Sequence, residues 1–478
     1  MESVLFVAAE AYPFVKTGGL GDMIGSLPQE LKKQGVDVRV ILPKYGQIPV
    51  HLREKMIHLK SFYVPLGWRQ QYCGIEMLEY NGLKYYFVDN EYYFKRQGVY
   101  GCYDDAERFA YLCRAVLEAL PYLEFEPQIL HCHDWHTAIL PVLLKAHYSQ
   151  KAEYDKLRTI LTIHNIHYQG VFDATIIEDI LELDRAEYFT SEKLEFFGQV
   201  NFLKAGIVYA DIITTVSPAY AKEIFSPAGG LGLEGVLRHR QDDIYGILNG
   251  IDIEVYNPAS DKIIFQNYTW HSLGERAANK TRLQEYLGLP VKPDVPIIAI
   301  VSRLVNSRGI GLVAEILDEL MATDLQLVIL GKGDEDYENM FRVAAHHYPA
   351  KLSANIFFEE TLAHRIFAAA DLYLLPSLIE PCGTRQLIAL RYGCVPIVRE
   401  TGGLKNTIIP FTEFTGEGNG FSFTEYNADS LMQAITRAVA IYHQPQIWPH
   451  VVVSAMKSDV GWRNSALEYR GLYDLVMK

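Results

Sequence analysis

The chain has 478 residues, of which 49% are hydrophobic and 21% charged, the balance of an ordinary globular protein with room for two or three domains. The formal net charge of −14 argues against nucleic acid and against an anionic membrane surface as partners, because both favour clusters of lysine and arginine.

Signals for membrane insertion, export and disulfide formation are missing from the sequence. No stretch of 18 apolar residues occurs, so no transmembrane helix is expected. The first residues lack a basic segment and their apolar run is short, which predicts a buried strand rather than a signal peptide. The six cysteines are scattered and form no CxxC pair, so neither a disulfide framework nor a cysteine-rich zinc site is expected. These features favour a reducing, cytoplasmic location.

Short apolar runs alternate with helical stretches in the first half of the chain. A strand is predicted at residues 4–8, a loop at 11–21 and a helix at about 22–34, with Asp22 as its N-cap. Further buried strands are expected at 38–42, 128–132, 159–163 and 211–216. The aromatic-rich stretch 66–103 is predicted to form a small β insertion. Apolar runs bounded by helices indicate parallel strands that are covered on both faces.

The same alternation begins again after Asn249. Strands are expected at 296–302, 325–331, 371–376 and 395–398. The chain is therefore predicted to be an α/β protein with two successive doubly wound domains. Ligands of such sheets bind beyond the carboxyl ends of the strands, so two domains of this kind would place a site in a central cleft that both of them face.

A glycine-rich loop follows the first predicted strand and reads Lys16-Thr17-Gly18-Gly19-Leu20-Gly21-Asp22. Adjacent glycines let backbone N–H groups approach an anion at a helix N-terminus, and Lys16 adds a positive charge. The alternative is a tight turn that needs positive φ. Both interpretations remain open, and the position after the first strand favours phosphate binding.

Two further segments of the second half carry polar groups at predicted strand ends. Arg303 and Arg308 follow its first strand, where arginine can hold phosphate oxygens in a bidentate fork; the alternative is a pair of solvated surface arginines. Glu380 opens a glycine-containing turn before a predicted helix. Its carboxylate could bond sugar hydroxyls, with the helix N-terminus holding a phosphate, or it could simply cap the helix.

Histidines gather at two strand ends of the first half. The run His131-Cys132-His133-Asp134-Trp135-His136 lacks remote ligands with zinc spacing, so a metal site is not favoured. Asp134 and His136 are instead predicted to bind a sugar beside a stacking Trp135. The alternative is a set of satisfied core histidines, but a second polar strand end at His164, after the next strand, favours a site. The GxGxxG match at 230–235 does not follow a clear strand and fails as a dinucleotide fingerprint, and no P-loop motif occurs.

Taken in order, these motifs resemble those of the bacterial glycogen synthase and plant starch synthase family along nearly the whole chain. The matching segments are Lys16-Thr17-Gly18-Gly19-Leu20, His133-Asp134-Trp135-His136, His164-Asn165, Asn201-Phe202-Leu203-Lys204-Ala205-Gly206, Thr215-Val216-Ser217-Pro218, Asn249-Gly250-Ile251-Asp252, Ser302-Arg303-Leu304, Glu380-Pro381-Cys382-Gly383 and Thr401-Gly402-Gly403-Leu404.

The resemblance implies the GT-B fold, in which two Rossmann-like domains face a central cleft. An acceptor-side domain at 1–245 would be completed by a C-terminal helix at 457–478, and 246–456 would bind the nucleotide sugar. The implied activity is retaining transfer of glucose from ADP-glucose to the non-reducing 4-OH of glycogen or another α-1,4-glucan. No metal and no cofactor are implied.

Roles for individual residues also follow from the resemblance. Lys16, Gly18 and Gly19 would lie at the donor phosphates, and Asp134 and His164 would contact the transferred glucose. Arg303 and Arg308 would stabilise the departing diphosphate, while Glu380 would hold glucose hydroxyls. The remaining substrate-binding positions are expected to be Asp22, Asn249, Phe358, Cys382, Gly383, Thr384 and Arg385.

The chain departs from the family pattern in its second half. Arg308 replaces a usual lysine, Phe358 stands where a tyrosine near the nucleobase is common, and Arg385 replaces a small threonine. We expect Arg385 to face the cleft and raise donor affinity. The alternatives are a catalytically weak or non-catalytic glucan-binding relative, a transferase that prefers UDP-glucose, and a Rossmann-type oxidoreductase.

Overall fold

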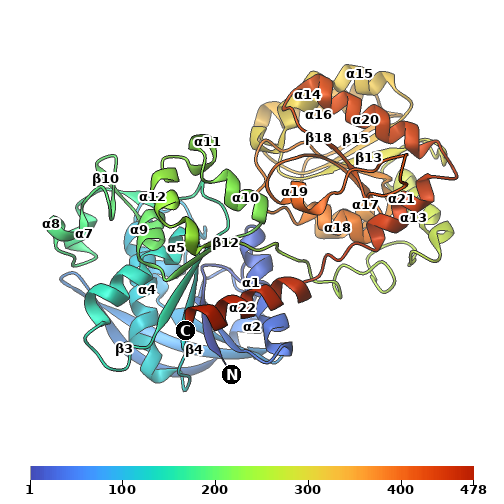
Figure 1. Ribbon diagram of the computed structural model, residues 1–478. Coiled ribbons are helices and arrows are strands. Elements are labelled where there is room, and N and C mark those ends of the chain that lie inside the picture. Colours follow the sequence, from blue (N-terminus) through green and yellow to red (C-terminus); the bar gives the residue numbers. More distant parts are fainter. Residues whose placement is uncertain (1) are drawn as a thin grey trace. The chain divides into compact units, whose positions relative to one another are not determined.

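The computed structural model describes residues 2–478 and divides the chain into two compact units (Figure 1). Unit 1 comprises Met1–Asn249 and Trp462–Lys478, and unit 2 comprises Gly250–Gly461. The first boundary between the units lies after Asn249, slightly beyond the expected residue 245. The C-terminal segment that returns to unit 1 starts at Trp462, later than the expected residue 457. No helix formed by residues 2–478 is long and apolar enough to cross a membrane.

Unit 1 is built around a nine-stranded sheet with the order β12-β11-β7-β6-β1-β2-β5-β4-β3. The parallel strands are β1 (Ser3–Val7), β2 (Asp37–Pro43), β5 (Leu83–Asp89), β6 (Ile129–His133), β7 (Arg158–Ile163), β11 (Ile212–Thr215) and β12 (Ile244–Gly246). The strand order reverses between β1 and β6. In doubly wound sheets such a switch point opens a crevice at the carboxyl edge.

The predicted β insertion at 66–103 is wrong, because its strands belong to the main sheet. β3 (Ile57–Leu66) and β4 (Arg69–Tyr80) form an antiparallel edge, and β5 pairs with β2 in parallel. A separate small sheet is formed elsewhere by β8 (Val171–Phe172), β9 (Glu195–Phe196) and β10 (Gln199–Asn201).

Helices cover the sheet of unit 1. The main ones are α1 (Gly19–Lys33), α4 (Asp105–Ala119), α5 (Trp135–Ala138), α6 (Leu140–Leu143), α9 (Phe202–Tyr209), α10 (Pro218–Glu223), α12 (Glu234–His239) and α22 (Arg463–Val476). The first helix begins earlier than predicted, with Gly18 as N-cap, so Asp22 lies in its first turn and is not the cap. α22 packs against this unit, where Tyr473 Oη lies 3.0 Å from His131 Nδ1.

Unit 2 has a six-stranded, all-parallel sheet with the order β15-β14-β13-β16-β17-β18. Its strands are β13 (Ile297–Val301), β14 (Gln326–Leu330), β15 (Leu352–Asn355), β16 (Leu372–Leu375), β17 (Val395–Arg399) and β18 (Phe421–Phe423). β13 is buried along its whole length, as expected of an apolar strand covered on both faces. The order reverses between β13 and β16, which gives this unit its own switch point.

Helices lie on both faces of this second sheet (Figure 1). One face carries α14 (Ile310–Glu315), α15 (Leu317–Ala322), α16 (Glu335–His347) and α20 (Ala428–Tyr442). The other carries α13 (Leu273–Tyr286), α17 (Glu360–Ala369), α18 (Arg385–Tyr392) and α21 (Trp448–Met456). The α/β class with parallel, doubly wound sheets predicted from the sequence is thereby confirmed.

A buried polar group ties the segment before α13 to α17 and α18. Asp261 Oδ2 lies 2.7 Å from His364 Nδ1 and accepts a 2.6 Å bond from the Tyr392 hydroxyl. Burial alone would lower the pKa of His364, but its hydrogen bonds to Asp261 and Glu360 outweigh burial and raise that pKa to about 9. His364 is therefore an imidazolium at neutral pH, held between carboxylates.

We expect this group to make the stability of unit 2 depend on pH. The folded-state pKa of His364 lies above the ordinary 6.5, so its contribution is complete below pH 6.5 and is lost as the pH rises through about 9, up to about 3 kcal/mol. Thermal unfolding midpoints between pH 6 and 9.5 measure it. His364→Gln should flatten the dependence, whereas the exposed His443→Gln should not; an unchanged slope in His364→Gln would contradict this role.

Candidate active site

The switch point of unit 1 brings three strand ends together. Glu10 follows β1, Asp134 follows β6 and His164 follows β7, and these strands are neighbours in the sheet. All three side chains are buried or nearly so. Charged and polar groups at this depth need specific partners, and their partners define the site.

Asp134 has the most unusual backbone of the three, with φ 57° and ψ −178°. A non-glycine residue in this region is strained, and such strain is typical of functional sites. Its Oδ1 accepts a 2.7 Å bond from the His164 backbone N–H. Burial raises the pKa of Asp134 to about 7, although the backbone N–H groups of His164 and Asn165 act to lower it.

Glu10 was missed by the sequence reasoning. Its Oε1 accepts bonds from the hydroxyls of Thr17, at 2.6 Å, and Tyr100, and its Oε2 accepts the backbone N–H of Thr17. This carboxylate therefore anchors the glycine-rich loop to the end of β1. The available signal was its position directly after the first strand, where the same rule that selected Asp134 applies.

The glycine-rich loop does not need its first two glycines for an unusual backbone. Gly18 has an extended φ of −162°, and Gly19 is not among the residues with positive φ. A Cβ added at either position would meet nothing within 4 Å. The alternative of a turn that requires positive φ is therefore wrong at these positions, and the loop presents open backbone. Lys16 pairs with Asp22 at 2.6 Å.

His164 is positioned by a second histidine. Its Nε2 lies 3.2 Å from Nδ1 of His133, the last residue of β6. Burial lowers the pKa of His164 to about 3 and that of His133 well below its ordinary value. Both rings are therefore neutral at physiological pH.

In unit 2 the loops after β13 and β16 come together at the second switch point. Gly309 has φ 74°, and a Cβ there would lie 2.0 Å from the Pro376 carbonyl oxygen, so only glycine allows this approach. Arg308 forms an ion pair with Glu380, and Ser377 Oγ donates to the same carboxylate at 3.0 Å. Arg303 is exposed, and no ion pair to it occurs within residues 2–478.

The backbone of the turn that follows Glu380 packs closely against the backbone at Gly402 and Gly403. Added Cβ atoms at Gly402 and Gly403 would lie 2.0 Å from the carbonyl oxygens of Glu380 and Cys382. Gly383, with φ 71°, and Thr384 lead into α18, and Gln386 Nε2 donates to the Cys382 and Gly383 carbonyls at 3.1 and 2.9 Å. α18 thus begins five residues after Glu380.

Arg385 and Phe358 are in direct contact. The Arg385 guanidinium carbon lies 5.0 Å from the centre of the Phe358 ring, a cation–π geometry. In the sequence these two residues are separate departures from the family pattern, with no sign that they meet. The fold joins them into one feature beside the start of α18.

Asn249 is the last residue of the first segment of unit 1 and follows β12. It is buried, and its Oδ1 has no hydrogen-bond partner among the residues that the structure describes. The remaining expected site residues divide between unit 1 and unit 2.

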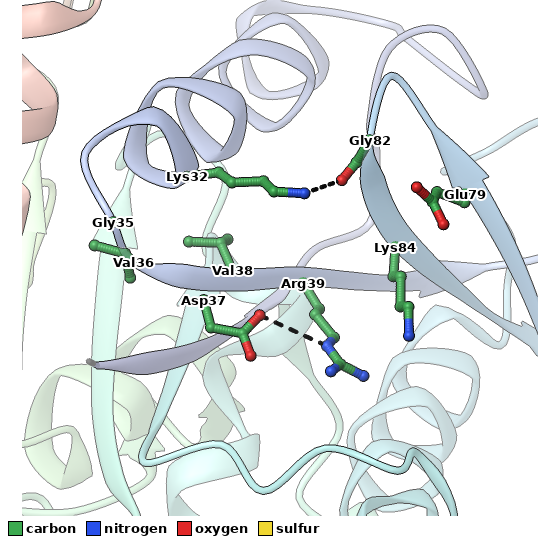
Figure 2. A pocket seen from close by; sticks show the side chains of 9 residues that line it. All are labelled: Lys32, Gly35, Val36, Asp37, Val38, Arg39, Glu79, Gly82 and Lys84. Carbon is green, nitrogen blue, oxygen red and sulfur yellow. Dashed lines mark hydrogen bonds and ion pairs between the residues drawn. The ribbon is translucent and has the colours of Figure 1, made fainter.

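A cavity of about 290 Å³ lies at the opposite edge of the first sheet (Figure 2). It is lined by residues at the amino end of β2 and around the β4–β5 turn, including Lys32, Asp37 and Arg39. Lys32 bonds the Gly82 carbonyl, and Arg39 bonds the Tyr86 hydroxyl, so two of the three cations in its lining are already engaged. We assign the site to the carboxyl edges instead, where doubly wound sheets bind ligands.

Both units match models of known protein families. The starch synthase catalytic domain matches residues 3–239, and glycosyl transferases group 1 matches residues 288–448. The chain is 55% identical to a glycogen synthase of Desulforamulus reducens, over 98% of both chains, and 53% identical to one of Caldicellulosiruptor saccharolyticus, over 100% of both.

A solved structure is also similar over the full length. The catalytic domain of starch synthase IV from Arabidopsis thaliana, bound to ADP and acarbose, has a TM-score of 0.93 at 31% identity and covers 100% of this chain and 99% of its own. The resemblance drawn from the motifs is thereby confirmed. The chain belongs to the glycogen and starch synthase family of glycosyltransferases.

Proposed function

We propose that the protein is a glycogen synthase that transfers glucose from ADP-glucose to the non-reducing 4-OH of an α-1,4-glucan, with retention of the α-anomer. The observation that carries the proposal is the cluster at the switch point of unit 2. Arg308 pairs there with the buried Glu380, Arg303 follows the same strand, and α18 begins five residues after Glu380, at the edge where a doubly wound sheet binds its ligand. This set suits a sugar attached to a diphosphate.

The chemistry that these residues would perform is leaving-group departure. Cleavage of the glucosyl–phosphate bond builds negative charge on the diphosphate and positive charge at the sugar. Arg303, Arg308 and the N–H groups of α18 would stabilise the diphosphate, and preorganised donors of this kind contribute most of the rate enhancement in many enzymes. Glu380 would bond glucose hydroxyls, and the departing phosphate would take the proton of the acceptor hydroxyl.

We further propose that unit 2 binds the nucleotide sugar and that unit 1 serves the acceptor. Asp134 and His164 would contact the transferred glucose, and the open backbone at Gly18 and Gly19, with Lys16, would approach the donor phosphates. The cysteines at all six positions are free thiols, which suits the reducing cytoplasm that we propose as the location.

Incorporation of labelled glucose into glycogen tests this function. We expect incorporation from ADP-glucose, less from UDP-glucose, and no loss in excess EDTA, because arginines supply the charge that Mg²⁺ would otherwise supply. Saturable glycogen binding without incorporation from either donor would instead support the non-catalytic alternative. A preference for UDP-glucose would overturn the proposed donor. A loss of activity in EDTA that only Mg²⁺ or Mn²⁺ restores would overturn the proposed metal independence.

Arg385→Thr is expected to weaken ADP binding about tenfold, or 1.4 kcal/mol. The substitution removes a cation that lies over Phe358 beside the start of α18, where a diphosphate is proposed to bind. Isothermal titration with ADP measures the change. Arg437→Thr is the matched control, because Arg437 also lies over a phenylalanine, Phe421, at 5.6 Å. Equal ADP affinity of Arg385→Thr and the parent would place Arg385 outside the site.

A further inference from the structure

We propose that His133 is a positioning residue that fixes the imidazole of His164 as an Nδ1–H donor on the accessible side of the unit 1 site. The inference deepens the proposed function and rests on it, because His164 is proposed to contact the transferred glucose. It assigns a role to a histidine that the sequence reasoning singled out only as part of a polar run.

The backbone of His133 is held firmly in place. Its N–H donates to Thr137 Oγ1 at 2.7 Å, and its carbonyl accepts from the same hydroxyl at 2.9 Å. The side chain is fully buried and packs against the ring of Phe6, with centroids 5.1 Å apart. A ring fixed in this way can orient its neighbour through the 3.2 Å contact between its Nδ1 and His164 Nε2.

A proton count limits this contact to two arrangements. Burial lowers the pKa of both histidines, so each neutral ring carries one N–H. Either His133 donates from Nδ1 and His164 carries its proton on Nδ1, or His164 donates from Nε2 and His133 carries its proton on Nε2. The two arrangements present opposite groups at Nδ1 of His164.

The surroundings of His133 Nε2 decide between them. This atom is enclosed and has no hydrogen-bond partner among residues 2–478. An enclosed N–H without an acceptor costs about 1–3 kcal/mol and is rare in folded proteins, whereas a bare ring nitrogen can rest against aromatic C–H groups. The first arrangement avoids the orphan N–H, and this outweighs the slight preference of free imidazole for the Nε2–H form.

The accessible nitrogen of His164 then carries the proton. Nδ1 of His164 makes no hydrogen bond within the described residues. It is also not one of their buried atoms that lack a partner, so it is reachable from outside. A fixed N–H at this point requires an oxygen acceptor from the ligand. A sugar hydroxyl would have to accept from His164, which orients the hydroxyl and selects one pose of the glucose.

The test reads the protonated nitrogen directly in the full chain labelled with ¹⁵N-histidine. The His164 resonances are assigned by their loss in His164→Gln, and long-range ¹H–¹⁵N spectra distinguish Nδ1–H from Nε2–H. We expect Nδ1–H in the wild type and in His133→Asn, whose amide nitrogen lies near the position of Nδ1, and a mixture in His133→Leu. A wild-type His164 protonated on Nε2 would overturn the proposal without any variant at His133.

Kinetics supply the second readout. His133→Leu should lower kcat with ADP-glucose about tenfold, equivalent to 1.4 kcal/mol, with little change in KM, and His133→Asn should restore most of it. His131→Leu is the matched control, because His131 is equally buried on the same strand but bonds Tyr473 and Thr162 rather than His164. Equal losses in His131→Leu and His133→Leu, with no rescue by asparagine, would reduce His133 to a packing role. A wild type without transfer activity would refute the proposed function, while the spectra would still test the tautomer.

Discussion

Arg308→Ala is expected to lower kcat for glucose transfer from ADP-glucose by about 10²–10³-fold, or roughly 2.7–4 kcal/mol, the effect of losing one preorganised donor at a developing charge. Arg308 is paired with the buried Glu380. The pair holds the guanidinium at the switch point of unit 2. Arg308→Lys should be mild, because lysine is the cation usual in the family. Steady-state kinetics with glycogen as acceptor measure both variants.

Arg303→Ala should lower kcat by a similar factor but should differ in stability. Arg303 is exposed and has no ion-pair partner within the described chain, so its removal should leave the unfolding midpoint unchanged. Arg308→Ala should lower the midpoint, because it leaves the Glu380 carboxylate buried without its cation. Arg282→Ala, on the surface of α13, is the control for both measurements. Either alanine variant that kept more than about a third of the wild-type kcat would lack the assigned role.

Asp134→Asn is expected to stabilise the protein while it removes activity. The folded-state pKa of Asp134 is raised to about 7 from an ordinary 3.8, so the folded protein favours the protonated carboxyl. The cost of ionising it grows as the pH rises from about 4 to 7 and then stays constant, up to about 4 kcal/mol. Asparagine keeps the oxygen that accepts the His164 N–H and never ionises. The variant should therefore gain stability above pH 7 and gain little near pH 4.

The same substitution should lower kcat by about 10²-fold, because Asp134 is proposed to contact the transferred glucose, where positive charge develops and asparagine supplies no negative charge. Thermal unfolding at pH 4.5 and pH 8 measures the change in stability, and kinetics at pH 8 measure the change in kcat. Asp211→Asn is a control at the other edge of the sheet, where a partly exposed carboxylate accepts the Thr159 N–H and hydroxyl at 2.7 and 2.8 Å. A stability gain in Asp134→Asn that was equal at both pH values would show that ionisation of the buried carboxyl is not its cause.

Strand ends were the part of the site that sequence could reveal. Asp134, His164, Arg303 and Glu380 each follow a short apolar run, and the structure places each of them beyond the carboxyl end of a parallel strand. The end of an apolar run in the sequence indicates where a buried strand ends, so the residues just beyond the strand can be identified without coordinates.

Contacts between distant segments could not be foreseen. The Arg308–Glu380 pair joins residues 72 positions apart, and the Arg385–Phe358 contact joins separate loops. The sequence predicts an insertion at 66–103, the stretch that contains β4 and β5, because an antiparallel edge and a separate sheet give the same local pattern. Only the pairing of β5 with β2 distinguishes them. Local sequence determines whether a segment forms a helix or a strand, whereas tertiary packing determines which other segments it contacts.

The return of the chain to unit 1 constrains the order in which the protein can mature during synthesis. α22 follows unit 2 in the sequence, yet its Tyr473 is buried against His131 in the first sheet, and the Arg463 carbonyl accepts a 2.9 Å bond from Gln34. All of unit 2 is translated before α22. The amino-terminal unit must therefore remain incompletely covered until α22 has been made, by which time the whole sequence of unit 2 is already present. Nascent chains thus hold an unfinished first unit for as long as the ribosome takes to make the second.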